Sequence, residues 1–410
     1  MANVIPGTVY LVGGAVRDQL LGINGGDRDY VVVGASPEAM RQAGFRPVGR
    51  DFPVFIGPHD GCEYALARTE RKRGRGHQGF EFHAAPEVTL EADLARRDLT
   101  INAIAQAADG SLVDPHGGLR DLAARVLRHV SPAFAEDPLR VLRVARFAAR
   151  FAPLGFALAP ETHALMRSMS RSGELTELSA ERVYAELHKA LQTPRPGMFI
   201  RVLHQAGGLA AWLAEIEALY NRPGAAAESG SSDAGTQLER SVDRAAALAP
   251  GDALIGYATL LHDLALGGEA ATASGDAPAV LLADQVSVRL KAPAEFAALA
   301  RSSARWQRHV AAIFSLRAAA ILGLLEGLDA LRKPERVAQL GRVVQAVAQA
   351  PDDAGPYPPA LFLDECLAAI RQVHAAPLRA AGLEGPELGV AMRQARLEAL
   401  AHLLELQNKS

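Results

Sequence analysis

The pattern of hydrophobic residues changes once along the chain, close to Asp137. Before this point, short runs rich in β-branched residues alternate with glycine and proline, which is typical of strands separated by turns. After it, apolar residues recur with helical spacing, and alanine and leucine dominate. The pattern therefore predicts an α+β part with a small mixed sheet, followed by an all-helical remainder. The expected strands are Thr8–Val12, Arg28–Val33, Glu63–Ala67 and Gly79–His83.

Two segments of small and polar residues interrupt the helical part, and both are typical of linkers or loops. They span Gly224–Gly235 and Gly267–Pro278. Together with the change of pattern, they predict three parts: residues 1–136, residues 137–220 and residues 221–410. We detect no repeat of fixed period, which argues against a solenoid or a propeller.

Composition narrows the class of protein. The 410 residues are 49% hydrophobic and 22% charged, the balance of a soluble globular protein with two to four compact units. The start of the chain lacks the pattern of a signal peptide, and no apolar run approaches the roughly 20 residues that span a bilayer. Two distant cysteines, Cys62 and Cys366, give neither a disulfide framework nor zinc spacing. We therefore expect a cytoplasmic protein without a membrane partner.

Positive charge is concentrated locally, although the net charge is −3. Only five of the 43 basic residues are lysines, and residues 68–75 carry five basic side chains against the single acid Glu70. Arginine binds phosphate oxygens with two parallel hydrogen bonds, which lysine cannot do. The arginine clusters therefore favour a phosphate-bearing partner such as a nucleic acid.

Two aspartates, Asp27 and Asp29, lie at the start of the second expected strand. Side chains two apart on a strand share a face, so the two carboxylates can bind one divalent cation, and hard oxygen ligands suit Mg²⁺. Upstream, Gly13 and Gly14 form a turn between a strand and a helix that carries Arg17, an arrangement in which backbone amides can approach phosphate. Each feature alone is common in turns and surface strands. Their close spacing indicates nucleotidyl transfer.

A third cluster combines Arg97 with Asp98 and Asn102, ahead of a short apolar stretch. These side chains offer hydrogen bonds suited to a ribose and a triphosphate. The alternative is a helix start with Asp98 as N-cap and Asn102 on the helix surface. The segment alone favours this alternative.

A row of arginines follows Asp137 and Pro138, which we interpret as the N-cap and first residue of a helix. Arginines stand at positions 140, 143, 146 and 150 with no acidic residue among them. Residues three apart are neighbours on a helix, where like charges repel by a few tenths of a kcal/mol per pair. An anionic partner is the natural compensation. Asp137 and Arg140 could present an acceptor and a donor fork to the edge of a base.

These motifs, taken in order, resemble those of the class II tRNA nucleotidyltransferases, and more narrowly those of the bacterial CCA-adding enzymes. The resemblance is dense from about residue 10 to 220 and weaker beyond. The motifs are Gly-Gly-x-Val-Arg-Asp at 13–18, Asp-x-Asp at 27–29, Arg-Arg-Asp-x-Thr-Ile-Asn-Ala at 96–103, Asp-Pro-x-Gly-Gly-x-x-Asp at 114–121, Glu-Asp-x-x-Arg at 136–140 and Glu-Arg-Val-x-x-Glu at 181–186.

The resemblance implies a polymerase-β-like catalytic head, a helical neck and body, and a helical tail. It implies that Asp27 and Asp29 are catalytic and bind Mg²⁺, that CTP and ATP are the substrates, and that the tRNA 3′ end is the partner, with no obligate protein partner. Asp137 and Arg140 would act as a protein template for the base, and residues 71–79 would be a flexible loop that switches specificity from C to A. The residues it assigns to nucleotide binding are Gly14, Arg17, Arg97, Asp98, Asp137, Arg140, Arg143 and Arg146. Glu63 is a possible further carboxylate.

The tail departs from the pattern of some relatives, which carry a metal-dependent phosphohydrolase domain of the His…His-Asp…Asp type. His262 and Asp263 are present, but Gln237 stands at the expected upstream ligand position, and no other histidine lies between His204 and His309. A metal site built from imidazoles needs more ligands than this. We therefore expect a degenerate tail in which this pair is structural.

Three alternatives to CCA addition stay open at this point. A poly(A) polymerase or an A-only-adding relative would share the head, although the end of the chain lacks a long basic tail. A non-catalytic tRNA-binding protein would not need the two aspartates. A phosphohydrolase acting through the tail is disfavoured by the missing histidines.

Overall fold

The computed structural model describes residues 5–23, 27–48, 54–72, 80–223, 233–265, 278–348 and 355–407, and gives the backbone alone at 70–72 and 80–83. The chain forms two compact units. Unit 1 comprises Met1–Val183 and Val202–Ala211, and unit 2 comprises Tyr184–Arg201 and Trp212–Ser410. The predicted three-part division stays a prediction.

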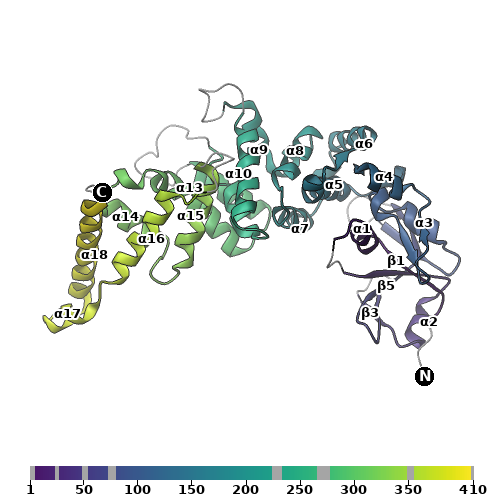
Figure 1. Cartoon of the computed structure of the whole chain (residues 1–410), viewed down its shortest axis with the longest axis horizontal. Coiled ribbons are helices and arrows are strands. Elements are labelled where there is room, and N and C mark those ends of the chain that lie inside the picture. Colours follow the sequence, from purple (N-terminus) through teal and green to yellow (C-terminus); the bar gives the residue numbers. More distant parts are fainter. Residues whose placement is uncertain are drawn as a thin grey trace. The chain divides into compact units, whose positions relative to one another are not determined.

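A seven-stranded mixed sheet forms the centre of unit 1 in the described part of the chain (Figure 1). The central strand β2 pairs antiparallel with β1 and parallel with β5. The order across the sheet is β3 (Arg46–Val48), β4 (Val54–Ile56), β5 (Glu63–Leu66), β2 (Asp29–Val33), β1 (Thr8–Val12), β8 (Ala105–Ala107) and β9 (Leu112–Val113). The small mixed sheet that the sequence predicts is confirmed.

The predicted strands agree with the structure to within one residue at each end. Thr8–Val12 is β1, and the strand predicted at Arg28–Val33 begins one residue later. The strand predicted at Gly79–His83 is β7 (Phe80–Ala84), which pairs antiparallel with β6 (Arg68–Lys72). Of the predicted flexible loop at 71–79, the first two residues belong to β6, and residues 73–79 lie outside the described residues.

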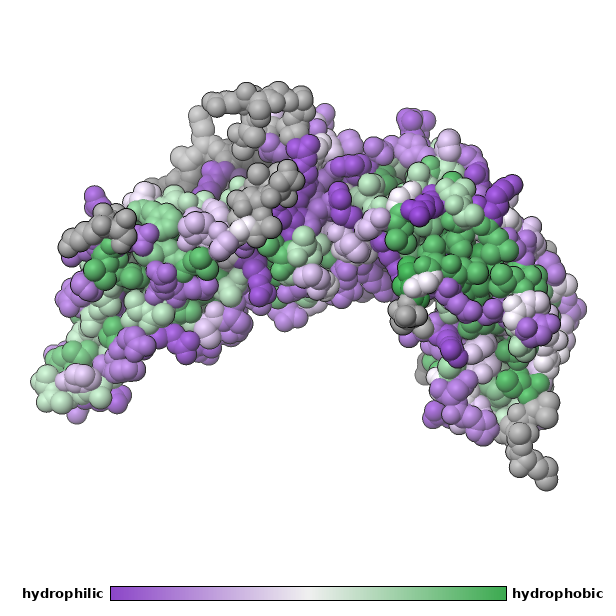
Figure 2. Space-filling view, in the orientation of Figure 1, coloured by the Kyte–Doolittle hydropathy of each residue, from purple (hydrophilic) through white to green (hydrophobic). Residues whose placement is uncertain are grey.

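Helices pack against both faces of the sheet. Consecutive residues of β2 point to opposite faces, and residues on each face pack against a different helix. Val31 packs in a cluster with Leu94 of α3, whereas Val32 packs in a second cluster with Met40 of α2. The helices of unit 1 are α1 (Gly14–Leu20), α2 (Pro37–Gln42), α3 (Leu90–Ala95), α4 (Gly118–Ala124), α5 (Leu139–Phe151) and α6 (Pro160–Arg171). Figure 2 shows a continuous hydrophobic area on unit 1, over α1 and β1.

Unit 2 is helical throughout its described residues. Asp233 caps α10 (Ala234–Leu248), and Asp252 caps α11 (Ala253–Leu260). The two carboxylates accept hydrogen bonds from backbone amides of their helices. The division of the chain between the two units falls within three helices: α7 (Ala180–Leu191), α8 (Gly197–Gln205) and α9 (Ala210–Glu217). The others are α10 (Ala234–Leu248), α11 (Ala253–Leu260), α12 (Pro278–Arg289), α13 (Ala294–Ala311), α14 (Ala318–Gly327), α15 (Glu335–Ala348), α16 (Pro358–Arg371), α17 (Ala375–Ala380) and α18 (Gly385–Gln407).

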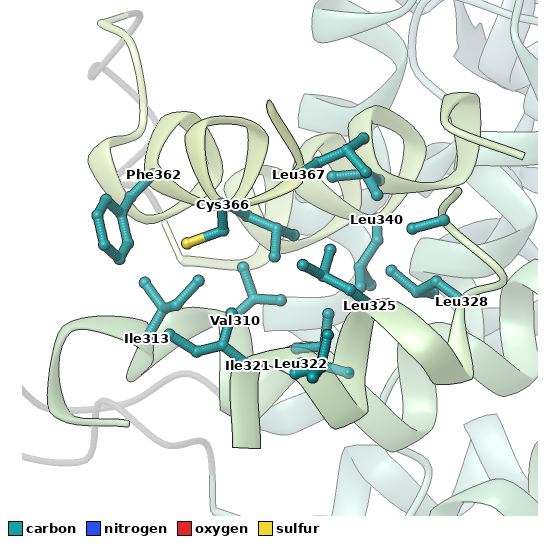
Figure 3. Packing of buried hydrophobic residues seen from close by; sticks show 14 of the residues in the cluster. Val310, Ile313, Ile321, Leu322, Leu325, Leu328, Leu340, Phe362, Cys366 and Leu367 are labelled. Carbon is teal, nitrogen blue, oxygen red and sulfur yellow. The ribbon is translucent and has the colours of Figure 1, made fainter. Parts of the chain in front are cut away.

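One hydrophobic core of unit 2 lies among α14, α15, α16 and α18. Ile321 and Leu325 of α14 face Phe362 and Cys366 of α16 (Figure 3). Cys366 is fully buried there, and burial raises the pKa of its thiol to about 12, so this cysteine acts as a small apolar side chain. In the described part of the chain, no helix has the length and apolarity needed to cross a bilayer.

Candidate active site

A cavity of about 570 Å³ opens within unit 1, and nearly all of the residues predicted to act in catalysis or nucleotide binding line it. Asp29 and Glu63 border it from the sheet, and Asp27 lies just before β2. The polar residues at the cavity are Arg17, Asp29, Glu63, Arg68, Arg96, Arg97, Asp98, Asn102, Asp137, Arg140, Arg143, Arg146, Arg150 and Arg182. The strands, the glycine turn and the arginine helix therefore meet at one place.

The acidic side of the cavity is built by strand register. Asp29 is the Cα partner of Val12 on β1 and of Glu63 on β5. Burial in the cavity and the charge of Glu63 raise the pKa of the Asp29 carboxyl; Arg97 opposes this shift, and Asp27 adds to it. Asp27 and Asp29 are both exposed, and within the described residues neither carboxylate is held by a hydrogen bond or an ion pair. Hard, mutually repelling oxygen ligands of this kind fit a divalent cation.

The glycine turn leads directly from β1 into α1. Gly13 has φ 70° and ψ −130°, which side chains disfavour, and a Cβ at Gly13 would lie 3.0 Å from Nη1 of Arg97. The turn therefore requires glycine for its conformation and for the close approach of an arginine. Gly14 is the first residue of α1 and borders the cavity.

Arg17 lines the cavity but is almost fully buried, with 2% of its surface exposed. Its guanidinium lies over the rings of Phe147 and Phe151, at 5.3 and 4.9 Å from their centroids, and pairs with Asp18 at 2.7 Å. Burial lowers the pKa of Arg17, against the opposing charge of Asp18. Its predicted contact with triphosphate stays a prediction.

A carboxylate of α3, Asp93, lies behind the arginines of the Arg96–Asn102 segment. Asp93 is fully buried and binds Arg96 at 2.7 Å and Arg97 at 3.1 Å. Burial would raise the pKa of Asp93, but the two guanidinium charges outweigh it and lower that pKa. The Nε of Arg97 is buried without a hydrogen-bond partner among the described residues. Asp93 therefore holds the guanidinium of Arg97 in place at the wall of the cavity.

Asp98 does not cap a helix, and the alternative interpretation of this segment is wrong. Its carboxylate accepts hydrogen bonds from the backbone N–H of Leu99, from Nδ2 of Asn102 and from Nε of Arg143. Asn102 is 6% exposed, so it does not lie on a helix surface. Burial opposes ionisation of Asp98, yet the Arg143 charge and these hydrogen bonds hold its pKa well below its usual range.

The start of α5 fixes the two residues predicted to read the base. Asp137 accepts hydrogen bonds from the backbone N–H of Leu139 and from Nη2 of Arg182, the latter at 2.9 Å. Arg140 donates to the carbonyls of Ala133 and Arg96. The helix begins at Leu139, one residue later than predicted. Protein contacts therefore orient both side chains beside the cavity, and their template role stays a prediction.

The remaining arginines of α5 have different surroundings. Arg143 pairs with Asp98 and Arg150 pairs with Asp18, both at 2.8 Å. Arg146 lies over the ring of Phe147, 4.4 Å from its centroid. Asp98 and Asp18 therefore offset part of the electrostatic repulsion among the arginines of α5. Sequence reasoning assigned no role to Asp18 or Asp93, and for Arg150 it predicted only the anionic partner expected of the whole arginine row.

His262 and Asp263 of unit 2 each contact a partner within the protein. Nδ1 of His262 lies 2.7 Å from the carbonyl oxygen of Thr259, and Asp263 pairs with Arg308 at 2.8 Å. Burial lowers the pKa of His262, against the effects of the Thr259 carbonyl and Asp263. Among the described residues, no three acidic, histidine or cysteine side chains converge as metal ligands. The degenerate tail stays a prediction.

Two segments of the chain match known protein families. Residues 9–128 match the family described as the poly A polymerase head domain, and residues 155–219 match the one described as a probable RNA- and SrmB-binding site of polymerase A. The class defined by the fold and these matches is that of template-independent nucleotidyltransferases with a poly(A)-polymerase-type head.

Relatives and solved structures narrow the class further. The multifunctional CCA protein of Xanthomonas campestris pv. campestris is 49% identical, over 97% of this chain and 99% of the relative. The apo form II structure of a CCA-adding enzyme has a TM-score of 0.67 at 22% identity, covering 96% of this chain and 88% of that one. The Bacillus stearothermophilus CCA-adding enzyme in complex with CTP has a TM-score of 0.64 at 24% identity, covering 98% and 93%. This chain belongs to the family of bacterial CCA-adding tRNA nucleotidyltransferases.

Proposed function

We propose that this chain adds the 3′-terminal CCA of tRNA from CTP and ATP, with Asp27 and Asp29 as its catalytic carboxylates. The observation that carries the proposal is the juxtaposition within one cavity of two acids on neighbouring strands, Asp29 and Glu63, and a row of arginines on α5. Metal-bound phosphoryl transfer needs both signs of charge, acids for the cation and arginines for the triphosphate.

Asp27 and Asp29 are the residues that would hold Mg²⁺, and Glu63 lies beside Asp29 on the neighbouring strand. When bound, Mg²⁺ lowers the pKa of a coordinated hydroxyl and neutralises charge on the departing pyrophosphate. The raised pKa of Asp29 supports this assignment, because burial and the Glu63 charge hinder its ionisation and a bound cation would offset both.

The nucleotide would lie between the glycine turn and α5. Gly14 lets the backbone approach phosphate, and Arg17 supplies a fixed charge behind it. Arg97 and Asp98 would bind the ribose and phosphates, a role supported by the buried, unpartnered Nε of Arg97. Arg143 and Arg146 would bind phosphate along the helix. The arginines act here by positioning and by stabilising charge, since phosphoryl transfer asks little covalent chemistry of the protein.

Base selection would use Asp137, a hydrogen-bond acceptor just before α5, and Arg140, a forked donor in its first turn. Arg182 orients the first, and two backbone carbonyls orient the second. Hydrogen-bond recognition by fixed polar groups discriminates strongly, because a wrong base leaves buried groups unpaired. No nucleic-acid template is then required.

The deciding experiment uses tRNA that lacks its last three nucleotides, with labelled CTP and ATP supplied separately and together. CCA addition predicts two cytidines from CTP alone and a halt after one adenosine when both are present. A poly(A) polymerase is the second candidate, favoured by the head-domain match, and predicts a long adenosine ladder. A non-catalytic tRNA-binding protein predicts no incorporation. Two free cysteines make a reducing compartment, the cytoplasm, the expected location.

A further inference from the structure

A buried carboxylate joins the first helix of unit 1 to the arginine helix. Asp18 of α1 is 3% exposed. Its Oδ1 pairs with Arg17 at 2.7 Å, and its Oδ2 accepts a hydrogen bond from Nη2 of Arg150 at 2.8 Å. Asp18 and Arg150 are 132 residues apart in the chain. A single acid therefore ties the glycine turn's helix to the last turn of α5.

A second buried acid anchors the same helix nearer its start. Asp98 is 7% exposed and pairs with Arg143 at 2.8 Å. Arg143 and Arg150 are seven residues apart, so they share a face of α5 about two turns, or roughly 10.5 Å, from each other. Two fixed points on one face set both the distance of a helix from its neighbour and its rotation.

The two anchors are themselves connected. Nη1 of Arg17 donates to Oδ1 of Asn102, and Nδ2 of Asn102 donates to Asp98. The contacts close a ring through Asp18, Arg17, Asn102, Asp98, Arg143, helix α5 and Arg150. A displacement of α5 at either anchor would therefore disturb the groups behind the glycine turn.

We infer that Asp18 and Arg150 are a positioning pair, which holds the nucleotide-binding face of α5 in register with the glycine turn. The inference rests on the proposed function and adds to it a buried acid outside the cavity, Asp18, and its partner Arg150 at the cavity wall. Asp18 does not border the cavity, and its negative charge would repel a triphosphate. Its effect on the reaction must therefore pass through the arginines that it holds.

Two substitutions test the pair from its two sides. Arg150→Ala and Asp18→Asn each release the end of α5, so both should lower kcat for CMP and AMP addition by on the order of ten- to hundredfold, the cost of small misplacements in near-attack geometry. The KM for tRNA should change by less than about twofold, because no tRNA contact is removed. Since both variants break one contact, the double variant should lose far less than the product of the single losses.

Rescue and a control separate positioning from general destabilisation. Arg150 reaches Asp18 through one nitrogen, so Arg150→Lys can keep the ion pair and should retain most of the wild-type kcat. Arg289→Ala is the matched control, because Arg289 is 35% exposed against 36% for Arg150 and pairs with Glu215 in unit 2. It should cost a similar amount of Tm and leave kcat unchanged.

Three results would overturn the inference. If Asp18→Asn is fully active, the carboxylate does not position the helix. If Arg150→Ala raises the KM for both nucleotides while kcat stays unchanged, Arg150 binds phosphate directly. If Arg289→Ala lowers kcat as much as Arg150→Ala at equal loss of Tm, the effect is ordinary destabilisation. If wild-type protein adds no nucleotide, the proposed function fails, whereas a double-mutant cycle of Tm still measures the pair.

Discussion

The two units each present a pair of residues of the metal-binding type, and the pairs differ in what surrounds them. In unit 1, Asp27 and Asp29 are exposed, adjoin Glu63 and lack protein partners among the described residues. In unit 2, His262 meets a backbone carbonyl and Asp263 meets Arg308. The first pair is left with unfavourable electrostatics, and the protein satisfies the second pair by itself.

We propose that this difference separates a pair that binds a cation from a pair that does not. Like charges at close range are costly unless a cation neutralises them, so a fold that keeps them together keeps them for a ligand. A histidine and an aspartate that are hydrogen-bonded and ion-paired gain little from a metal, which would have to displace those partners. The following experiments test the contrast, in order of expected effect.

The largest effect is expected at the acids of unit 1. Asp27→Ala or Asp29→Ala should lower nucleotide addition by about 10³-fold or more, because several kcal/mol of charge stabilisation is lost from the transition state. The tRNA affinity and the Tm should stay close to wild type, since both side chains are exposed. A double variant that adds CCA at the wild-type rate would refute the assignment. Incorporation from labelled CTP measures the effect.

A smaller effect is expected in nucleotide choice. Arg140→Ala should reduce the preference for CTP and ATP over GTP and UTP by about tenfold or more, since a polar recognition group is removed. Arg146→Ala on the same helix is the control, because loss of a phosphate contact should weaken all four nucleotides equally. The measurement is kcat/KM for each nucleotide. An unchanged selectivity in Arg140→Ala would contradict the template role.

In unit 2, substitutions should affect stability and leave nucleotide addition unchanged. His262→Ala should cost about 1–3 kcal/mol, because a half-buried ring and its hydrogen bond are lost. Asp263→Asn should cost less than about 1 kcal/mol, because Arg308 is 61% exposed and the ion pair is solvent-screened. Thermal unfolding with and without added Mn²⁺ or Ni²⁺ measures both. A metal-dependent rise in wild-type Tm that His262→Ala abolishes would show a surviving metal site.

The smallest effect concerns pH. Burial lowers the pKa of His262, so the unfolded chain takes up its proton at higher pH than the folded chain. The contribution of His262 to stability is therefore present above the pKa that His262 has in the unfolded chain. It is lost as pH falls through that value. His129 and His309 act in the same direction. Wild-type Tm should fall from about pH 7.5 to about pH 5.5, and His262→Gln should show a shallower fall. Equal slopes would argue against a buried neutral imidazole.

The sequence predicted the strands that carry the acids because their pattern is local. Thr8–Val12 and the strand ending at Val33 are bounded by glycines and rich in β-branched residues. The three-residue strands β3 and β4 were missed, since so short a run shows no alternation. The pairing of β2 with both β1 and β5 was also beyond a sequence pattern, because it depends on chain topology.

Side-chain partners were the hardest part of the site to predict. The unbroken arginine row of α5 indicated an anionic partner, and two of its members find theirs in Asp98 and Asp18. Sequence spacing shows that charges need compensation, but it does not show whether a ligand or a distant carboxylate supplies it. Asn102 illustrates the same limit, because its burial follows from contacts with Arg17 and Asp98 rather than from local propensity.

The register of β1 against β2 has a consequence for how such a site can arise. Val12 faces Asp29 across the ladder, so the last residue before the glycine turn is tied to the acid by backbone pairing alone. A slip of one residue would turn every side chain of the strand to the opposite face. One backbone register therefore sets the positions of both the proposed cation ligand Asp29 and the glycine turn, so the two features arise together.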